Sequence, residues 1–172
     1  MPINRRKFSA ICALLVPMIL SVSASADGLM APSESAILVV AGNITKTNKG
    51  RRAMLDRPML EKMSEAKIRT KTPWYTDEVE FEGVSFLTLL SEVGANGEKL
   101  RITALDDYSV EVDIDDLVKN KAILALKRDG NNLSISDKGP LFVVYPYDSK
   151  PELKNEKYYS RSVWQVRLIE VR

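Results

Sequence analysis

The sequence predicts an α+β domain, a mixed β-sheet with a few short helices. Most apolar residues recur in short runs with a period of two, which is typical of half-buried strands. Turn residues, such as those at positions 106–107 and 129–131, separate several of these runs at close spacing. Only two longer segments have helical spacing. Strands and helices therefore do not alternate as they do in a parallel βαβ fold.

The first elements come before residue 71. Residues 36–42 (AILVVAG) are a continuous apolar run that ends in glycine, and we expect a buried strand followed by a turn. Asp56 is suited to cap a helix whose first turn contains Pro58. The apolar side of this helix comprises Leu55, Met59, Leu60 and Met63. A short strand is expected at residues 67–70.

The middle of the chain contains a second helix and a hairpin. Residues 81–84 are expected to open the helix, and Gly94 to end it as a C-cap. The residues that pack inward from it are Phe86, Leu87, Leu89, Leu90 and Val93. Residues 100–105 and 108–114 alternate as two strands around a turn at Asp106 and Asp107. One helical turn then covers residues 115–119, with Asp115 or Asp116 as its cap.

The last third of the chain is predicted to be mostly strand. Residues 122–127 form a strand that ends in the tight turn 129–131, and residues 141–145 form a buried strand. The polar segment 148–156 is expected to be a mobile loop. A half-buried strand follows near the C-terminus, and its apolar positions are Val163, Val166, Leu168 and Val171.

The N-terminal segment has the features of a secretory signal peptide. Arg5, Arg6 and Lys7 precede the short apolar run 10–20, and Ala24-Ser25-Ala26 supplies a cleavage site. The expected organisation is a cleaved signal at residues 1–26, a flexible leader at 27–35 and a single domain at 36–172. The basic pair also resembles a twin-arginine signal, so the export route stays open. Both routes place the mature protein in the periplasm.

Removal of this segment changes the composition. Without its three basic residues, the 25 Lys and Arg fall to 22, against 23 Asp and Glu. A net charge of −1 argues against nucleic acid as a partner. The single cysteine, Cys12, lies in the signal, and the chain has no histidine. The mature protein therefore has no disulfide partner, no thiolate metal site and no Cys or His nucleophile.

Four stretches carry a resemblance to a known family. They are FEGVSFLTLL at residues 81–90, AILA at 122–125 with Asp129-Gly130, DKGPLFVV at 137–144 and RSVWQV at 161–166. In this order they resemble the molybdopterin-binding domain of the sulfite oxidase family, over essentially the whole mature chain. The resemblance implies a sulfite oxidase-like fold and a cofactor cradle for a pterin.

Two departures from the family pattern bear on function. The family's oxidoreductases carry a cysteine that binds molybdenum in the loop before the FEGV stretch, whereas this loop reads RTKTPWY at residues 69–75. A hydroxyl or an amine does not replace a soft thiolate at such a centre. In addition, Trp164 stands where the family has a phosphate-binding lysine. The chain therefore resembles periplasmic pterin-binding proteins that dock on the sensor domain of a membrane cyclic di-GMP enzyme and regulate it.

This resemblance implies a binding site for an unconjugated pterin, with no metal and no catalytic residue, and it leaves open whether the pterin is reduced. Trp74 and Trp164 would stack on the pterin, and the planar fork of Arg161 would bind its edge. Ser162 would supply a smaller donor, and Thr72 marks the place of the absent thiolate. The predicted pterin-binding residues are Thr72, Trp74, Asp107, Tyr108, Asp137, Lys138, Arg161, Ser162 and Trp164.

Each residue also has an ordinary structural interpretation. The tryptophans suit a core, Arg161 suits a surface, and Asp107 and Asp137 suit turns. Two alternative functions stay open beside the sensor: a molybdopterin-dependent oxidoreductase of the sulfite oxidase family, and a ligand-free adaptor. A regular strand would turn Arg161 and Ser162 to opposite faces. We therefore expect residues 160–162 to form a loop, with extended structure from Val163 onward.

Overall fold

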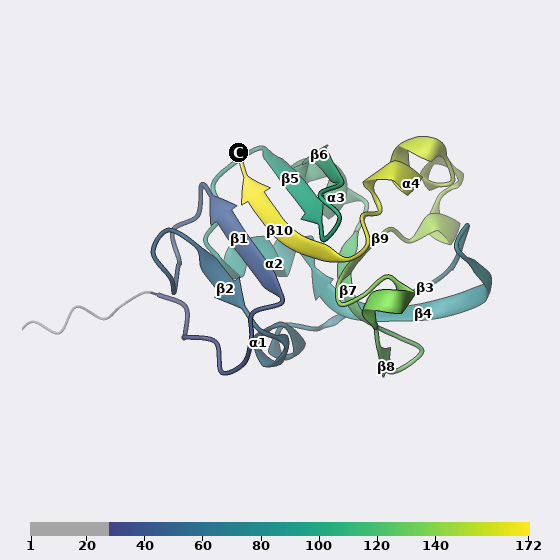
Figure 1. The fold of residues 1–172 in the computed structure, drawn as a ribbon. Helices are drawn as coiled ribbons and strands as arrows, with labels where there is room; N and C mark the ends of the chain where they lie inside the picture. Colours follow the sequence, from purple (N-terminus) through teal and green to yellow (C-terminus); the bar gives the residue numbers. More distant parts are fainter. Residues whose placement is uncertain (1–27) are drawn as a thin grey trace, which may run out of the picture.

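The computed structural model describes residues 28–172, and the predicted signal peptide lies outside this part of the chain. The α+β class is confirmed, but the strands form two five-stranded sheets rather than one (Figure 1). The first sheet has the order β2-β1-β10-β5-β6. Its strands are β1 (Leu38–Gly42), β2 (Ala53–Leu55), β5 (Lys99–Ala104), β6 (Ser109–Asp113) and β10 (Val166–Val171). Only β1 and β10 pair in parallel, so the sheet is mixed.

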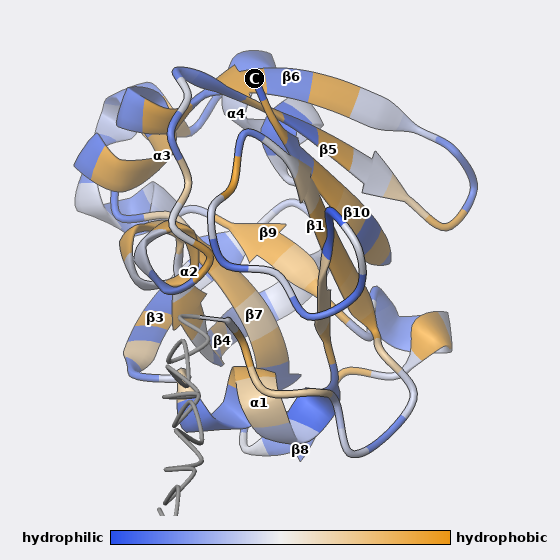
Figure 2. Ribbon diagram, turned by 90° about the vertical axis from the view of Figure 1, so that its left-hand side faces the viewer, coloured by the Kyte–Doolittle hydropathy of each residue, from blue (hydrophilic) through white to orange (hydrophobic). Residues whose placement is uncertain are grey.

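The second sheet is antiparallel and has the order β3-β4-β7-β8, with β9 also paired to β7. Its strands are β3 (Ala66–Thr72), β4 (Tyr75–Ser85), β7 (Ile123–Arg128), β8 (Asn131–Asn132) and β9 (Phe142–Val144). The core lies where the two sheets meet, and β9 there is buried at every position. Figure 2 shows the apolar strands β7, β9 and β10 in this region.

Short helices cover the ends of the sheets. The α-helices are α1 (Arg57–Lys62), α2 (Phe86–Glu92), α3 (Ile114–Lys119) and α4 (Glu156–Arg161). The 3₁₀ helices are η1 (Ile135–Asp137), η2 (Tyr147–Ser149) and η3 (Pro151–Leu153). None of the helices within residues 28–172 has the length and hydrophobicity needed to cross a membrane.

The cap predicted for α1 is confirmed and has a second role. Asp56 accepts a hydrogen bond from the Met59 N–H at 3.0 Å, as an N-cap should. Its other carboxylate oxygen accepts the N–H groups of Ser33, at 2.5 Å, and Glu34, at 2.9 Å. The end of the predicted flexible leader is thus anchored to the start of α1.

The second helix begins later than predicted. Residues 81–84 belong to β4, where Phe81 pairs with Ile68 of β3 on one side and Arg128 of β7 on the other. The helix α2 follows Ser85, whose hydroxyl accepts the Thr88 N–H at 3.1 Å. Leu87 was expected to pack inward, but its side chain is 63% exposed because it falls on the outer face of the short helix.

Three further expectations are corrected. The N-cap of α3 is Asp113, and Asp115 and Asp116 lie in its first turn, where carboxylates suit the helix dipole. Segment 148–156 is not an irregular loop, because it contains η3 with Leu153 buried. Residues 160 and 161, expected in a loop, complete helix α4, and β10 begins only at Val166.

Candidate functional site

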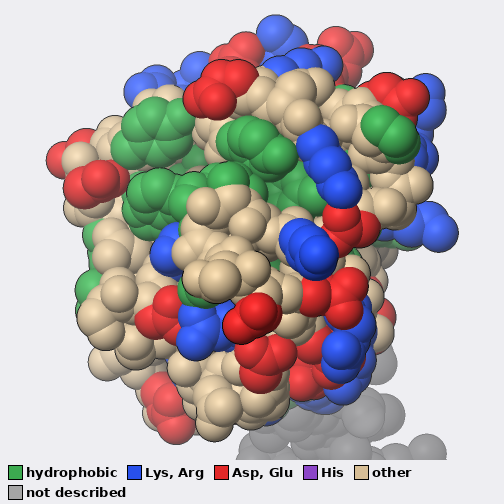
Figure 3. Space-filling view, turned by 90° about the vertical axis from the view of Figure 1, so that its right-hand side faces the viewer, with side chains coloured by type: hydrophobic (Ala, Val, Ile, Leu, Met, Phe, Trp, Pro, Cys, Tyr) green, Lys and Arg blue, Asp and Glu red, His purple; other side chains and the backbone are tan. Residues whose placement is uncertain are grey.

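A pocket of about 440 Å³ opens where α4, the β3–β4 turn and the β5–β6 turn meet. Figure 3 shows hydrophobic side chains gathered around a hollow on this face of the molecule. Four aromatic residues line the pocket from all three elements: Trp74, Tyr108, Tyr159 and Trp164. The volume lies in the range of small-molecule sites in proteins.

Trp74 is the centre of the aromatic cluster. It lies in the turn between β3 and β4, where its backbone N–H donates to Thr72 Oγ1 at 3.3 Å. Its ring is edge-to-face with those of Trp164 and Tyr159, with both centroid distances 5.9 Å. It also packs on the buried Phe142 at 5.4 Å. These contacts hold the Trp74 ring as a fixed wall of the pocket.

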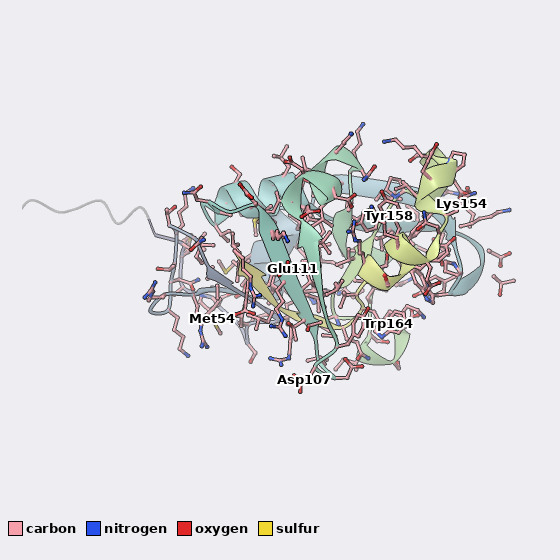
Figure 4. All side chains as sticks on the ribbon, turned by 90° about the horizontal axis from the view of Figure 1, so that it is seen from above. Met54, Asp107, Glu111, Lys154, Tyr158 and Trp164 are labelled. Atoms are coloured by element: carbon pink, nitrogen blue, oxygen red, sulfur yellow. The ribbon has the colours of Figure 1, made fainter. Side chains whose placement is uncertain are left out.

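Trp164 forms the adjacent wall and is 39% exposed. In Figure 4 it lies on the same side of the molecule as Tyr158 of α4, opposite Met54. Val163 and Gln165, which flank it, are held by the chain beside them. The Val163 carbonyl accepts the Val143 N–H at 2.9 Å, and the Gln165 N–H donates to the Lys138 carbonyl at 3.0 Å. The exposed ring is therefore carried on a fixed backbone.

The polar lining of the pocket is acidic. Asp106 and Glu156 both line it, whereas no Lys or Arg does. Asp106 accepts the Tyr108 N–H at 3.1 Å, and the Tyr108 hydroxyl donates to the Ser160 carbonyl at 2.9 Å, which joins the β5–β6 turn to α4. The site therefore suits a flat ligand that presents hydrogen-bond donors, and disfavours an anionic group.

Ser162 lines the pocket, but its hydroxyl forms hydrogen bonds with residues beneath the pocket. The residue is buried, and its hydroxyl donates to the Tyr158 carbonyl at 2.7 Å. Because the Ser162 hydroxyl donates its only proton to this carbonyl, the Tyr147 hydroxyl must be the donor in its hydrogen bond with Ser162 Oγ. Burial raises the pKa of Tyr147 well above its usual range, so this donor keeps its proton. Tyr147 is thus part of the support beneath the pocket.

The structure places Arg161 outside the pocket lining. Its Nη1 lies 3.0 Å from Asp116 Oδ2, and both side chains are mostly buried. The same carboxylate accepts hydrogen bonds from the hydroxyls of Tyr145 at 3.3 Å and Tyr158 at 3.4 Å. The reason is the helical conformation of residue 161, which directs its side chain toward α3. Burial, and then the Asp116 charge, raises the pKa of Tyr145.

Four of the predicted residues are bound elsewhere or lie beside the pocket. Thr72 is turned to the Trp74 backbone. Asp107, with φ of 67°, directs its carboxylate to Arg167 at the outer tip of the β5–β6 turn. Asp137 accepts from Arg128 Nη1 at 2.9 Å and from the Tyr75 hydroxyl at 3.0 Å. The Lys138 ammonium lies 5.9 Å from the centre of the Trp164 ring.

The structure thus brings Trp74, Tyr108, Ser162 and Trp164 together in one pocket. Sequence reasoning missed Asp106, Glu156 and Tyr159. Asp106 was visible as the neighbour of Asp107 in the same turn, but the sequence does not show which of the two carboxylates faces the pocket. The other two are carried by α4, and without that helix nothing in the sequence directs them to the pocket.

Comparison with known proteins adds two findings. Residues 51–149 match the family described as oxidoreductase molybdopterin binding domain. Among solved structures, the sulfane dehydrogenase SoxCD from Paracoccus pantotrophus is similar, with a TM-score of 0.55 and 16% sequence identity. The similarity covers 78% of this chain and 37% of that chain, and at this identity it shows the fold alone. No curated protein sequence matches the chain.

Proposed function

The chain belongs to the oxidoreductase molybdopterin binding domain family, and from the pocket that it carries we infer that it binds a pterin without molybdenum. The observation that carries this proposal is the combination of an aromatic lining with two carboxylates. A pterin has a flat bicyclic face, and its amino-pyrimidine edge presents N–H donors. The rings of Trp74 and Trp164 are nearly perpendicular, so one of them can stack on this face while the other contacts the ring edge-on. Asp106 and Glu156 fit the amino-pyrimidine edge, because a carboxylate accepts two parallel hydrogen bonds.

The side chains of the pocket fit the pterin ring, but they do not fit a molybdenum centre. The loop that carries the metal-binding cysteine in the oxidoreductases holds Thr72 here, and its hydroxyl accepts from the Trp74 N–H. Residues 28–172 contain neither cysteine nor histidine. The phosphate of a full molybdopterin would also meet Asp106 and Glu156 rather than a cation. We therefore assign no catalytic step to the metal.

In the finer form of this proposal, the protein is a periplasmic sensor. It docks on the periplasmic domain of a membrane enzyme that makes or degrades cyclic di-GMP, and pterin occupancy regulates that enzyme. The predicted secretory signal and the absence of a thiolate support this role. The identity of the partner rests on the resemblance alone.

A titration of the purified protein with pterins tests the binding proposal. We expect saturable quenching of pterin fluorescence at micromolar concentration. The double variant Asp106→Asn/Glu156→Gln should weaken binding by about 1.5–3 kcal/mol, the range for charge-assisted hydrogen bonds. The variant Asp77→Asn, on an exposed residue away from the pocket, is the matched control. No saturable binding of any oxidised or reduced pterin would contradict the proposal.

Metal analysis tests the alternative function, a molybdopterin-dependent oxidoreductase of the kind that the family description names. The protein should be purified from cells that make molybdenum cofactor. We expect no stoichiometric molybdenum. One molybdenum per chain, together with turnover of a sulfur oxyanion, would establish the oxidoreductase instead.

A further inference from the structure

The strand β3 is an edge strand of the second sheet. The direction in which the peptide groups of β3 point can be worked out from the hydrogen bonds that β4 forms on its other side, toward β7. There, Glu80 donates its N–H to Asp129 Oδ1 at 2.9 Å and accepts the Asp129 N–H at 2.8 Å, so its peptide groups point toward β7. Because successive residues of a strand alternate, Val79 and Phe81 of β4 point toward β3.

The residues of β3 that pair with them are Thr70 and Ile68. By the same alternation, the N–H and carbonyl groups of Lys67 and Arg69 point away from β4, to the outer edge. The next residue of this parity, Lys71, confirms the direction, because its N–H donates outward to Asp148 Oδ2 at 2.6 Å. No strand lies beyond Lys67 and Arg69 within the described residues. Their hydrogen-bonding groups form a short open edge.

This edge borders a second pocket, of about 680 Å³, which we call the β3 groove. The far wall of the groove consists of the start of α2, the turn from α3 to β7 and the residues that follow β9. Five cations line it and no acidic residue does: Lys67, Arg69, Lys119, Lys121 and Lys150. The last three form no ion pair within residues 28–172.

The chain already shows which strand β3 accepts on its paired side. Strand β4 reads EVEFE at residues 78–82, and Lys67 lies 3.1 Å from Glu82 and 3.7 Å from Glu80 across the pair. Arg69 lies 3.7 Å from Glu80 and from Glu78. Cross-strand pairs of opposite charge of this kind select the partner of a basic strand.

We propose that the β3 groove binds an extended acidic segment of a partner protein, which adds to the sheet as a strand beside β3. The open N–H and carbonyl groups of Lys67 and Arg69 supply the backbone bonds of such strand addition. The three unpaired lysines on the far wall supply the charge that selects an acidic segment.

The inference deepens the proposed function, because it assigns the surface that contacts the partner. Its basis is separate, since the β3 groove shares no lining residue with the aromatic pocket. The two proposals can therefore fail independently. Variants of the β3 groove should leave pterin affinity unchanged, and Trp164→Ala should leave peptide affinity unchanged.

A fluorescent peptide copied from β4, residues 77–82 (DEVEFE), is the probe. Fluorescence anisotropy with the purified protein should give saturable binding. The double variant Lys119→Glu/Lys121→Glu should weaken it at least tenfold, and Arg51→Glu, on an exposed cation outside the groove, should not. Two further peptides carry N-methyl groups on alternate residues, one set on the odd and one on the even positions. Strand addition predicts that only one of the two loses binding.

Three outcomes would overturn the proposal. The first is no saturable binding of the acidic peptide up to millimolar concentration. The second is equal binding of both N-methylated peptides, because the contact would then be electrostatic only. The third is binding of vesicles with anionic lipid that Lys119→Glu/Lys121→Glu abolishes while the peptide does not bind, since the groove would then be a lipid-binding surface.

Discussion

Arg161 at the end of α4 forms an ion pair with Asp116 in the first turn of α3, with 3.0 Å between Nη1 and Oδ2. The side chains are only 16% and 17% exposed. The pair therefore ties α4, which contributes Glu156, Tyr159 and Ser160 to the pocket lining, to the rest of the domain. In this structure the guanidinium contacts Asp116 and does not line the pocket, and the contact with the ligand that the sequence predicted stays a prediction.

The variant Arg161→Ala should lower the stability of the ligand-free protein. It leaves the Asp116 carboxylate in a mostly buried place without its cation, at a cost of about 2–3 kcal/mol. Chemical denaturation measures this cost. A double-mutant cycle with Asp116→Ala should give a stabilising coupling energy between the two side chains, because they are in contact. Unchanged stability with abolished pterin binding would instead restore the direct contact to ligand.

The variant Trp164→Ala should weaken pterin binding and leave the fold intact. The ring is 39% exposed and packs edge-to-face on Trp74 and Phe142, so its removal creates no closed cavity. We expect a loss of about 1–2 kcal/mol in binding from stacking and lost contact area. Fluorescence titration and thermal unfolding measure the two effects. Leu87→Ala, on another exposed apolar residue outside the pocket, should change neither.

The stability that Asp148 contributes should disappear at low pH. The Lys154 ammonium and the Lys71 N–H lower the pKa of its carboxylate from 3.8 to about 2. A depressed folded-state pKa means that the contribution is fully present above about pH 4 and is lost as the pH falls through 2. Asp148→Asn should therefore be less stable than wild type at pH 7. The difference should shrink between pH 4 and pH 2.

Urea denaturation at pH 7, 5, 4 and 3 measures this trend. The matched variant Asp77→Asn changes an exposed aspartate that forms no ion pair among the described residues. It should show no such dependence. A difference between Asp148→Asn and wild type that stays constant to pH 3 would contradict the assigned ion pair.

The variant Gly83→Ala should destabilise the second sheet severely. A Cβ at this position would lie 2.1 Å from the Leu124 carbonyl oxygen and 2.6 Å from the Ala125 Cα, both backbone atoms of β7. The strands would have to separate, and we expect a cost of at least about 3 kcal/mol. Gly130→Ala is the contrast, because its Cβ meets nothing within 4 Å. Its φ of 77° costs about 1 kcal/mol for a non-glycine residue.

The sequence predicted those parts of the fold whose signals are local. The Asp56 cap, the hairpin around Asp106 and Asp107, and the turn at Gly130 were all confirmed, because each depends on residues a few positions apart. The end of β4 was also readable: Glu78, Glu80 and Glu82 alternate with Val79 and Phe81 up to Gly83. The prediction placed the start of the second helix too early, at residues 81–84, which belong to β4.

Helix α4 and the environment of Arg161 were beyond local signals. The six residues of α4 show no apolar stripe, and none is fully buried. The helix depends on contacts with distant residues, such as Tyr158 with Asp116 and Ser162 with Tyr147. The meeting of Trp74 and Trp164 was predicted by the family resemblance, and no period or cap in the sequence would have placed them in one pocket.

The central position of β10 has a consequence for the order of folding. Ile169 pairs with Val40 of β1 on one side and with Ile102 of β5 on the other, so the last strand joins segments from the start and the middle of the chain. Contacts between such distant segments form slowly, because a long loop must close before they bring any gain. Until β10 has docked, β1 and β5 each keep an open edge, and the partly folded chain is then prone to pair with other chains.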